Sequence, residues 1–212
     1  MPPTTSNSLH DELTARSGMY RLLARIWLRE VDQSLLQQLA SAEMRDAFVG
    51  AGGALPADDS DETIEELAID YCQLFLGPKD HLPPFQSVWQ SGQFEATDSE
   101  SMQQFIEVVR YDSSHIPQGT MPDHLGLQLD LMAHLLGSSP GEEVQEVASY
   151  FFARHLQWPD GLLERASHLA KTDFYRSAVS LTREFLAAEN LALGWDTIQK
   201  GEAPAEPHGT NG

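Results

Sequence analysis

Apolar residues recur every three or four positions along most of this chain, which is the spacing of amphipathic α-helices. No alternating strand pattern of useful length and no internal repeat interrupts this spacing. The helical pattern covers residues 8–30, 32–48, 62–75, 99–112, 120–136, 140–155, 162–170 and 173–188. We therefore predict an all-α protein, a single-domain helical bundle with a long irregular loop between its third and fourth helices.

The most apolar of these segments begins at Thr120, and its pattern predicts a helix in the middle of the bundle. Thr120 is the expected N-cap and Pro122 lies in the first turn, where its missing N–H does no harm. Asp123 follows Thr120 by three residues, which is the spacing of a capping box. Leucines cover most of the remaining surface and leave a narrow polar stripe of Asp123, Asp130 and His134.

The irregular loop spans residues 77–98 and contains several prolines and glycines with few helical signals. Loops of this length that lack secondary structure are usually functional or disordered. Phe85, Trp89 and Phe94 make this one too apolar for disorder, so we expect it to pack on the bundle. The loop is therefore the best candidate for a binding surface.

Polar segments flank the helical pattern, and we expect residues 1–7 and 200–212 to be disordered around a domain of residues 8–199. The single cysteine, Cys72, excludes a disulfide framework and a cysteine-based zinc site. No apolar run approaches ~20 residues, and the start of the chain lacks a basic segment followed by an apolar one. We thus expect neither a membrane span nor an export signal of its own.

Acidic residues outnumber basic residues by 32 to 13, which gives a formal net charge of −19. This charge argues against sequence-independent binding to nucleic acid or anionic lipid, because both require cations that neutralise phosphates. It favours a cationic partner, or serves solubility alone.

Catalytic motifs are missing: the sequence has no glycine-rich phosphate loop, no G-x-S-x-G turn and no H-E-x-x-H helix. Asp130 and His134 are four residues apart, as metal ligands on one helix can be, and Asp123 lies on the same stripe. These three residues could serve a small metal-dependent hydrolase. The alternative is structural, with Asp123 as a cap and the other two as an ordinary i, i+4 pair.

A recognition role uses some of the same residues. Asp123 and His124 at the start of a helix, beside a loop that carries Phe85 and Trp89, could form a groove with an apolar floor and an acidic rim. Such a groove suits a peptide that is apolar along one side and basic at one end.

Three blocks carry a family resemblance: residues 70–78 (DYCQLFLGP), 83–89 (PPFQSVW) and 122–126 (PDHLG). In order and spacing they resemble the TorD/DmsD family of redox-enzyme maturation chaperones, as do the later pieces His155-Leu156-Gln157-Trp158 and Phe174-Tyr175. The resemblance extends from about residue 8 to about residue 193. One departure stands out: Thr120 and Met121 occupy the places of a Glu-Pro pair in the family pattern, and the Asp-His pair is kept.

The resemblance implies a non-enzymatic, all-helical chaperone of the cytoplasm, with no cofactor or metal of its own. Members bind the twin-arginine signal peptide, and sometimes the body, of a molybdenum-containing oxidoreductase subunit, prevent its premature export and assist cofactor insertion. The peptide-binding residues implied here are Phe75, Gly77, Pro78, Pro84, Phe85, Ser87, Trp89, Asp123 and His124. A monomer and a homodimer that exchanges helices are both compatible with the loops, and a helical adaptor for an unrelated partner is the remaining alternative.

Overall fold

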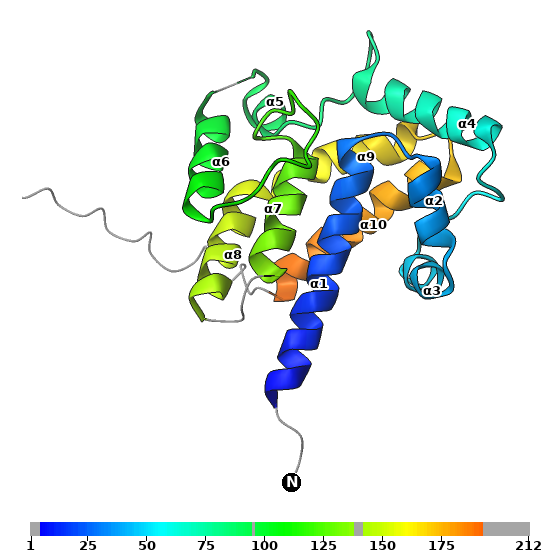
Figure 1. The fold of residues 1–212 in the computed structure, drawn as a ribbon. Coiled ribbons are helices and arrows are strands. Elements are labelled where there is room, and N and C mark those ends of the chain that lie inside the picture. The colour runs from blue at the N-terminus through cyan, green and yellow to red at the C-terminus, as the bar shows by residue number, and fades with distance from the viewer. Residues whose placement is uncertain (1–4, 95, 138–141, 193–212) are drawn as a thin grey trace, which may run out of the picture.

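The computed structural model describes residues 5–94, 96–137 and 142–192, and Figure 1 shows these residues as an assembly of helices. The elements are α1 (Thr5–Leu28), α2 (Gln33–Ala40), α3 (Ala42–Gly50), α4 (Asp61–Tyr71), the π-helical turn η1 (Cys72–Leu76), α5 (Gln86–Ser91), α6 (Ala96–Val108), α7 (Leu125–Gly137), α8 (Glu142–His155), α9 (Asp160–Leu169) and α10 (Asp173–Ala192). The predicted all-α class is confirmed. The segments predicted to be disordered fall mostly outside the described residues, although α1 already includes residues 5–7.

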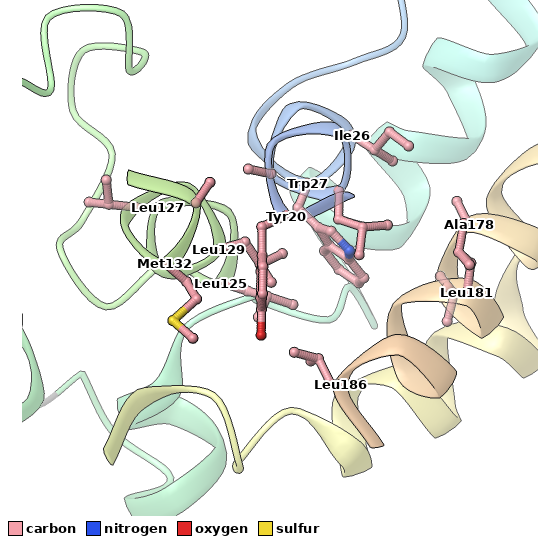
Figure 2. Close-up of a cluster of buried hydrophobic side chains, with 14 of the residues drawn as sticks. Tyr20, Ile26, Trp27, Leu125, Leu127, Leu129, Met132, Ala178, Leu181 and Leu186 are labelled. Carbon is pink, nitrogen blue, oxygen red and sulfur yellow. The ribbon is translucent and has the colours of Figure 1, made fainter. Parts of the chain in front are cut away.

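Helix α7 lies in the centre, as its apolar composition predicts, and packs along α1 (Figure 1). Leu125, Leu129 and Met132 are completely buried. A Cβ atom on Gly126 would lie 2.7 Å from the Cγ atom of Leu28, so the glycine allows α1 and α7 to approach closely. Figure 2 shows this core, with side chains from α1, α7 and α10 meeting between the helices.

Helix α10 is joined to α1 by buried polar contacts as well as by apolar packing. Glu189 accepts hydrogen bonds from Nε and Nη2 of Arg16 at 2.9 and 2.8 Å and from the hydroxyl of Tyr20 at 3.0 Å. Burial, followed by the charge of Glu189, raises the pKa of Tyr20 well above its usual value. Trp27 Nε1 donates to Thr182 Oγ1 at 3.0 Å in the same interface. These contacts fix the two longest helices against each other.

Three predicted boundaries are wrong. The second predicted helix breaks at Ser41, whose extended backbone separates α2 from α3. The third ends as an α-helix at Tyr71 and continues as the π-helical turn η1. The predicted loop of residues 77–98 contains the short helix α5 and the start of α6, so its irregular parts are shorter than expected.

The predicted start of the central helix at Thr120 is also wrong, because α7 begins five residues later. Thr120 instead closes a local turn, in which its hydroxyl donates to the carbonyl oxygen of Pro117 at 2.7 Å. Along the described part of the chain, no helix combines the length and apolarity that a membrane crossing requires.

Candidate functional site

The second and third motif blocks meet in space. Phe85 and His124 form an isolated antiparallel β-bridge. On either side of it, the N–H of Gln86 donates to the carbonyl oxygen of Asp123 at 3.1 Å, and the N–H of Leu125 donates to that of Pro84 at 2.8 Å. We call residues 84–87 and 123–125 together the junction. The extended backbone that the bridge requires explains why α7 cannot begin before Leu125.

The carboxylate of Asp123 is completely buried and supports the junction from within. One oxygen accepts from the N–H of Ser87 at 3.1 Å and from its hydroxyl at 2.6 Å, and the other accepts from the hydroxyl of Ser99 at 3.2 Å. A carboxylate that accepts from the first N–H groups of a helix caps it and complements its dipole. Asp123 therefore caps α5 and holds α6, and the capping box predicted with Thr120 is wrong.

His124 caps the central helix in place of Thr120. Its Nδ1 accepts from the N–H of Gly126 at 3.0 Å, while its carbonyl oxygen accepts from the N–H of Gln128 at 3.0 Å. An accepting Nδ1 carries no proton, so the ring is neutral with its proton on Nε2. Burial lowers the pKa of His124 to about 4, and the negative charge of Asp123 acts in the opposite direction without offsetting it. The ring also packs edge-on against Phe85, at 5.3 Å between centroids.

A buried polar network, missed by the sequence reasoning, lies behind the junction. The Oε1 atom of Gln86 accepts from Gln128 Nε2 at 2.7 Å and faces Nδ1 of His155 at 2.9 Å. Since an amide oxygen can only accept, His155 is protonated on Nδ1, and its Nε2 accepts from the hydroxyl of Ser101 at 3.0 Å. Burial, and then the charge of Arg154, lower the pKa of His155 to about 3. The available signal was Gln128, a glutamine among the leucines of the central helix.

Aromatic side chains cover the outer side of the junction. The ring of Phe94 is 62% exposed and packs edge-on against Phe85 at 5.5 Å. Trp89 is half-buried, and its Nε1 donates to the carbonyl oxygen of Pro83 at 2.8 Å. The guanidinium group of Arg165 lies 5.7 Å from the Trp89 ring. Phe94 was not among the predicted site residues, although its place in an apolar loop was visible in the sequence.

Comparison with known proteins identifies the family to which the chain belongs. The family model of the nitrate reductase delta subunit matches residues 29–164. A TorD chaperone from Shewanella pealeana is 25% identical over 197 residues, which cover 82% of this chain and 87% of the relative. The chaperone YcdY from Escherichia coli K12 is 26% identical over 192 residues, or 87% of this chain and 96% of the relative.

The chain belongs to the nitrate reductase delta subunit family. This is the TorD/DmsD group that the three motif blocks predicted, and the named relatives are chaperones, so the chain is a chaperone rather than an enzyme. Chaperones of this group serve molybdoenzyme subunits. A crystal structure of a candidate redox enzyme maturation protein from Archaeoglobus fulgidus matches 81% of this chain and 93% of its own chain, with a TM-score of 0.53 and 15% identity. This match shows a shared fold.

The first family block lies apart from the junction contacts described above. The ring of Phe75 is buried against Trp27 and Tyr71, at 4.9 and 5.2 Å between centroids. Gly77 is buried where η1 ends, and Pro78 beside it is exposed. The structure thus brings together Pro84, Phe85, Ser87, Asp123 and His124, with Trp89 nearby on α5.

The metal-dependent hydrolase predicted as an alternative for Asp123, Asp130 and His134 is not supported. Asp123 is used at the junction, whereas Asp130 accepts from the hydroxyl of Tyr111 and lies 2.8 Å from Nε2 of His115. Burial, with the neighbouring Asp130, raises the pKa of Tyr111 above its usual value. Among the described residues, no three His, Cys, Asp or Glu side chains are grouped so as to hold a metal ion.

Proposed function

We propose that this chaperone acts in the cytoplasm on a molybdenum-containing oxidoreductase subunit, binding the twin-arginine leader and the body of its precursor. By holding the precursor, it prevents premature export and assists insertion of the molybdenum cofactor. The observation that carries this proposal is the junction, where residues 83–89 and 122–126 pair through a β-bridge beside the exposed ring of Phe94.

Within the candidate set, exposure separates two roles. Phe85 and Trp89 are half-buried and Pro78 is exposed, so these three can touch a peptide directly. The other members are buried and shape the surface from below: Phe75, Gly77, Pro84, Ser87, Asp123 and His124. Phe94 joins the first group because its ring is exposed and in contact with Phe85.

The charge of the chain matches the chemistry of a twin-arginine leader. The net charge of −19 attracts a segment with paired arginines, and carboxylate–guanidinium pairs are geometrically specific. Burial of the apolar part of the leader contributes about 25 cal/mol per Å² before the cost of ordering the peptide. Electrostatics therefore orient the leader and apolar contacts supply most of the affinity.

The test is binding of labelled leader peptides from the molybdoenzyme precursors of the same genome, measured by fluorescence anisotropy with and without their arginine pair replaced by glutamine. Phe94→Ser should weaken binding about tenfold, because exposed aromatic side chains dominate such interfaces. Leu191→Ser, which removes a comparably exposed apolar side chain from α10, is the matched control and should change nothing.

If no leader and no full precursor binds the wild-type chain, the proposed function is wrong, and a helical adaptor for another partner becomes the better interpretation. Light scattering on the same samples distinguishes a monomer from a homodimer that exchanges helices, the two forms that we propose for the chain.

A further inference from the structure

An apolar groove lies between α6 and α8, outside the candidate set described above. It has a volume of about 450 Å³ and is lined by Ser101, Gln104, Phe105, Val108, Glu146, Val147 and Tyr150. Val108 is 79% exposed and Tyr150 is 63% exposed, although both are large apolar or aromatic side chains. Monomeric proteins seldom leave such side chains grouped in a depression unless a partner covers them.

A larger depression, of about 600 Å³, lies between α8, α9 and α10. Its polar side chains already pair with one another, since Arg183 binds Asp160 and Gln157 donates to Asn190. The groove between α6 and α8 differs because its apolar side chains are the ones left uncovered.

The α6 wall of the groove has the spacing of a helix-binding surface. Ser101, Gln104, Phe105 and Val108 stand at positions i, i+3, i+4 and i+7 and form one stripe along the helix. At 1.5 Å per residue this stripe is roughly 10 Å long, or about two helical turns. A third helix placed between two helix walls is a common mode of peptide recognition.

The groove is physically connected to the junction. Phe105, one of the residues that line it, packs edge-on against His155 at 5.5 Å, and His155 faces Gln86 at the start of α5. At the other end of α6, Ser99 donates to the carboxylate of Asp123. One helix therefore contacts the junction with its first turns and forms a groove wall with its last ones.

The charge around the groove selects a basic occupant. Helix α6 carries the exposed residues Glu100 and Glu107 and has no lysine or arginine. On α8, Glu146 lines the groove, whereas Arg154 lies 3.5 Å from the buried carboxylate of Asp98 and pairs with it. The groove thus combines an apolar floor with a negatively charged surround, which is complementary to an apolar segment that has basic residues at one end.

We propose that the groove between α6 and α8 binds the apolar stretch of the client leader as a short helix of about two turns, with the preceding basic residues held by the acidic surround. This inference rests on the proposed function, because it places the leader that the junction surface would also contact. Helix α6 then links the junction, which it contacts through Ser99, to the groove that it lines.

The test uses the leader that binds tightest in the peptide panel, together with a version whose apolar stretch is replaced by serines. The double variant Val108→Ser/Tyr150→Ser should weaken the native leader about tenfold and the serine version less than about twofold. The variant Val49→Ser/Leu191→Ser removes comparable exposed side chains from α3 and α10 and should leave both affinities unchanged.

A photoreactive residue at position 108 in the otherwise unchanged chain gives a second readout, which should cross-link to the apolar stretch of the leader. The inference is overturned if the double variant binds the native leader normally, or if cross-links form only elsewhere in the leader. If Phe94→Ser still weakens binding in that case, the proposed function survives. If no leader binds the wild-type chain, both fail together.

Discussion

Asp123 allows the sharpest test of how the junction works, because its carboxylate is buried and yet belongs to the implied peptide-binding set. Replacing it with alanine removes three hydrogen bonds, two from Ser87 and one from Ser99. Hydrogen bonds to a charged acceptor contribute about 1.5–3 kcal/mol each, and a buried N–H left without a partner costs about 1–3 kcal/mol. Serine hydroxyls can turn to other acceptors, so the sum overestimates the loss.

We expect Asp123→Ala to lower the free energy of unfolding by about 3 kcal/mol, mainly because the N–H of Ser87 loses its acceptor. In a domain of this size, such a loss lowers the melting temperature by about 6–12 °C. Urea unfolding followed by circular dichroism at 222 nm measures the first quantity, and a thermal scan measures the second. Ser99→Ala removes only the longest of the three hydrogen bonds and should cost about 0.5–1 kcal/mol.

Leader affinity, measured well below the melting temperature of each variant, completes the experiment. Because the carboxylate faces the protein, we expect Asp123→Asn, which keeps one accepting oxygen, to retain most of the binding and part of the stability. Normal stability of Asp123→Ala combined with lost binding would refute this reasoning. In that case Asp123 would contact the client, and the buried arrangement would not be the one that binds.

Further predictions concern the core and the buried histidines. Gly126→Ala should destabilise the chain by about 1–3 kcal/mol in urea unfolding, because the new methyl group would lie 2.7 Å from a leucine carbon on α1, whereas Gly18→Ala has open space and should not destabilise it. Glu189→Gln should cost about 3 kcal/mol by the same measurement, since its arginine partner on α1 is left with a largely buried charge. The pKa values of His124 and His155, about 4 and about 3, lie below the usual 6.5, so stability present above pH ~6.5 is lost as the pH falls and the unfolded chain takes up protons. Each histidine contributes about 1.4 kcal/mol per pH unit in that range. We therefore expect the free energy of unfolding of His155→Gln to fall less steeply between pH ~6 and ~4 than that of the wild-type chain. An unchanged slope would contradict the lowered pKa of His155.

The sequence predicted the helices well, because the spacing of apolar residues is a local signal that packing then satisfies. The burial of the helix that follows Thr120 was readable from its leucines. Breaks without a glycine or proline were not readable: Ser41 ends one helix and begins the next, although the apolar spacing continues through it. The π-helical turn after Tyr71 was hidden for the same reason.

The candidate site was predictable only in its parts. Family blocks pointed to Phe85 and to the Asp-His pair, but no local pattern shows that segments so far apart in the chain pair with each other. The spacing from Thr120 to Asp123 fitted a capping box, so the carboxylate was assigned to its own helix. In the structure the Asp123 carboxylate caps α5 instead. A contact between residues so far apart in the chain leaves no periodic pattern in the sequence.

The junction also has a consequence for how this chain can diversify. The backbone enters at Pro84 and returns at Leu125, and these two residues are hydrogen-bonded to each other. The stretch between them, with α5, α6 and the aromatic surface, is thus an excursion that begins and ends at one place. Its exposed positions, such as Phe94 and Val108, can change while its buried hydrogen bonds to Asp123 and Gln128 stay the same. Substitutions at these exposed positions can in this way change what the chaperone binds without changing the stability of the helices beneath them.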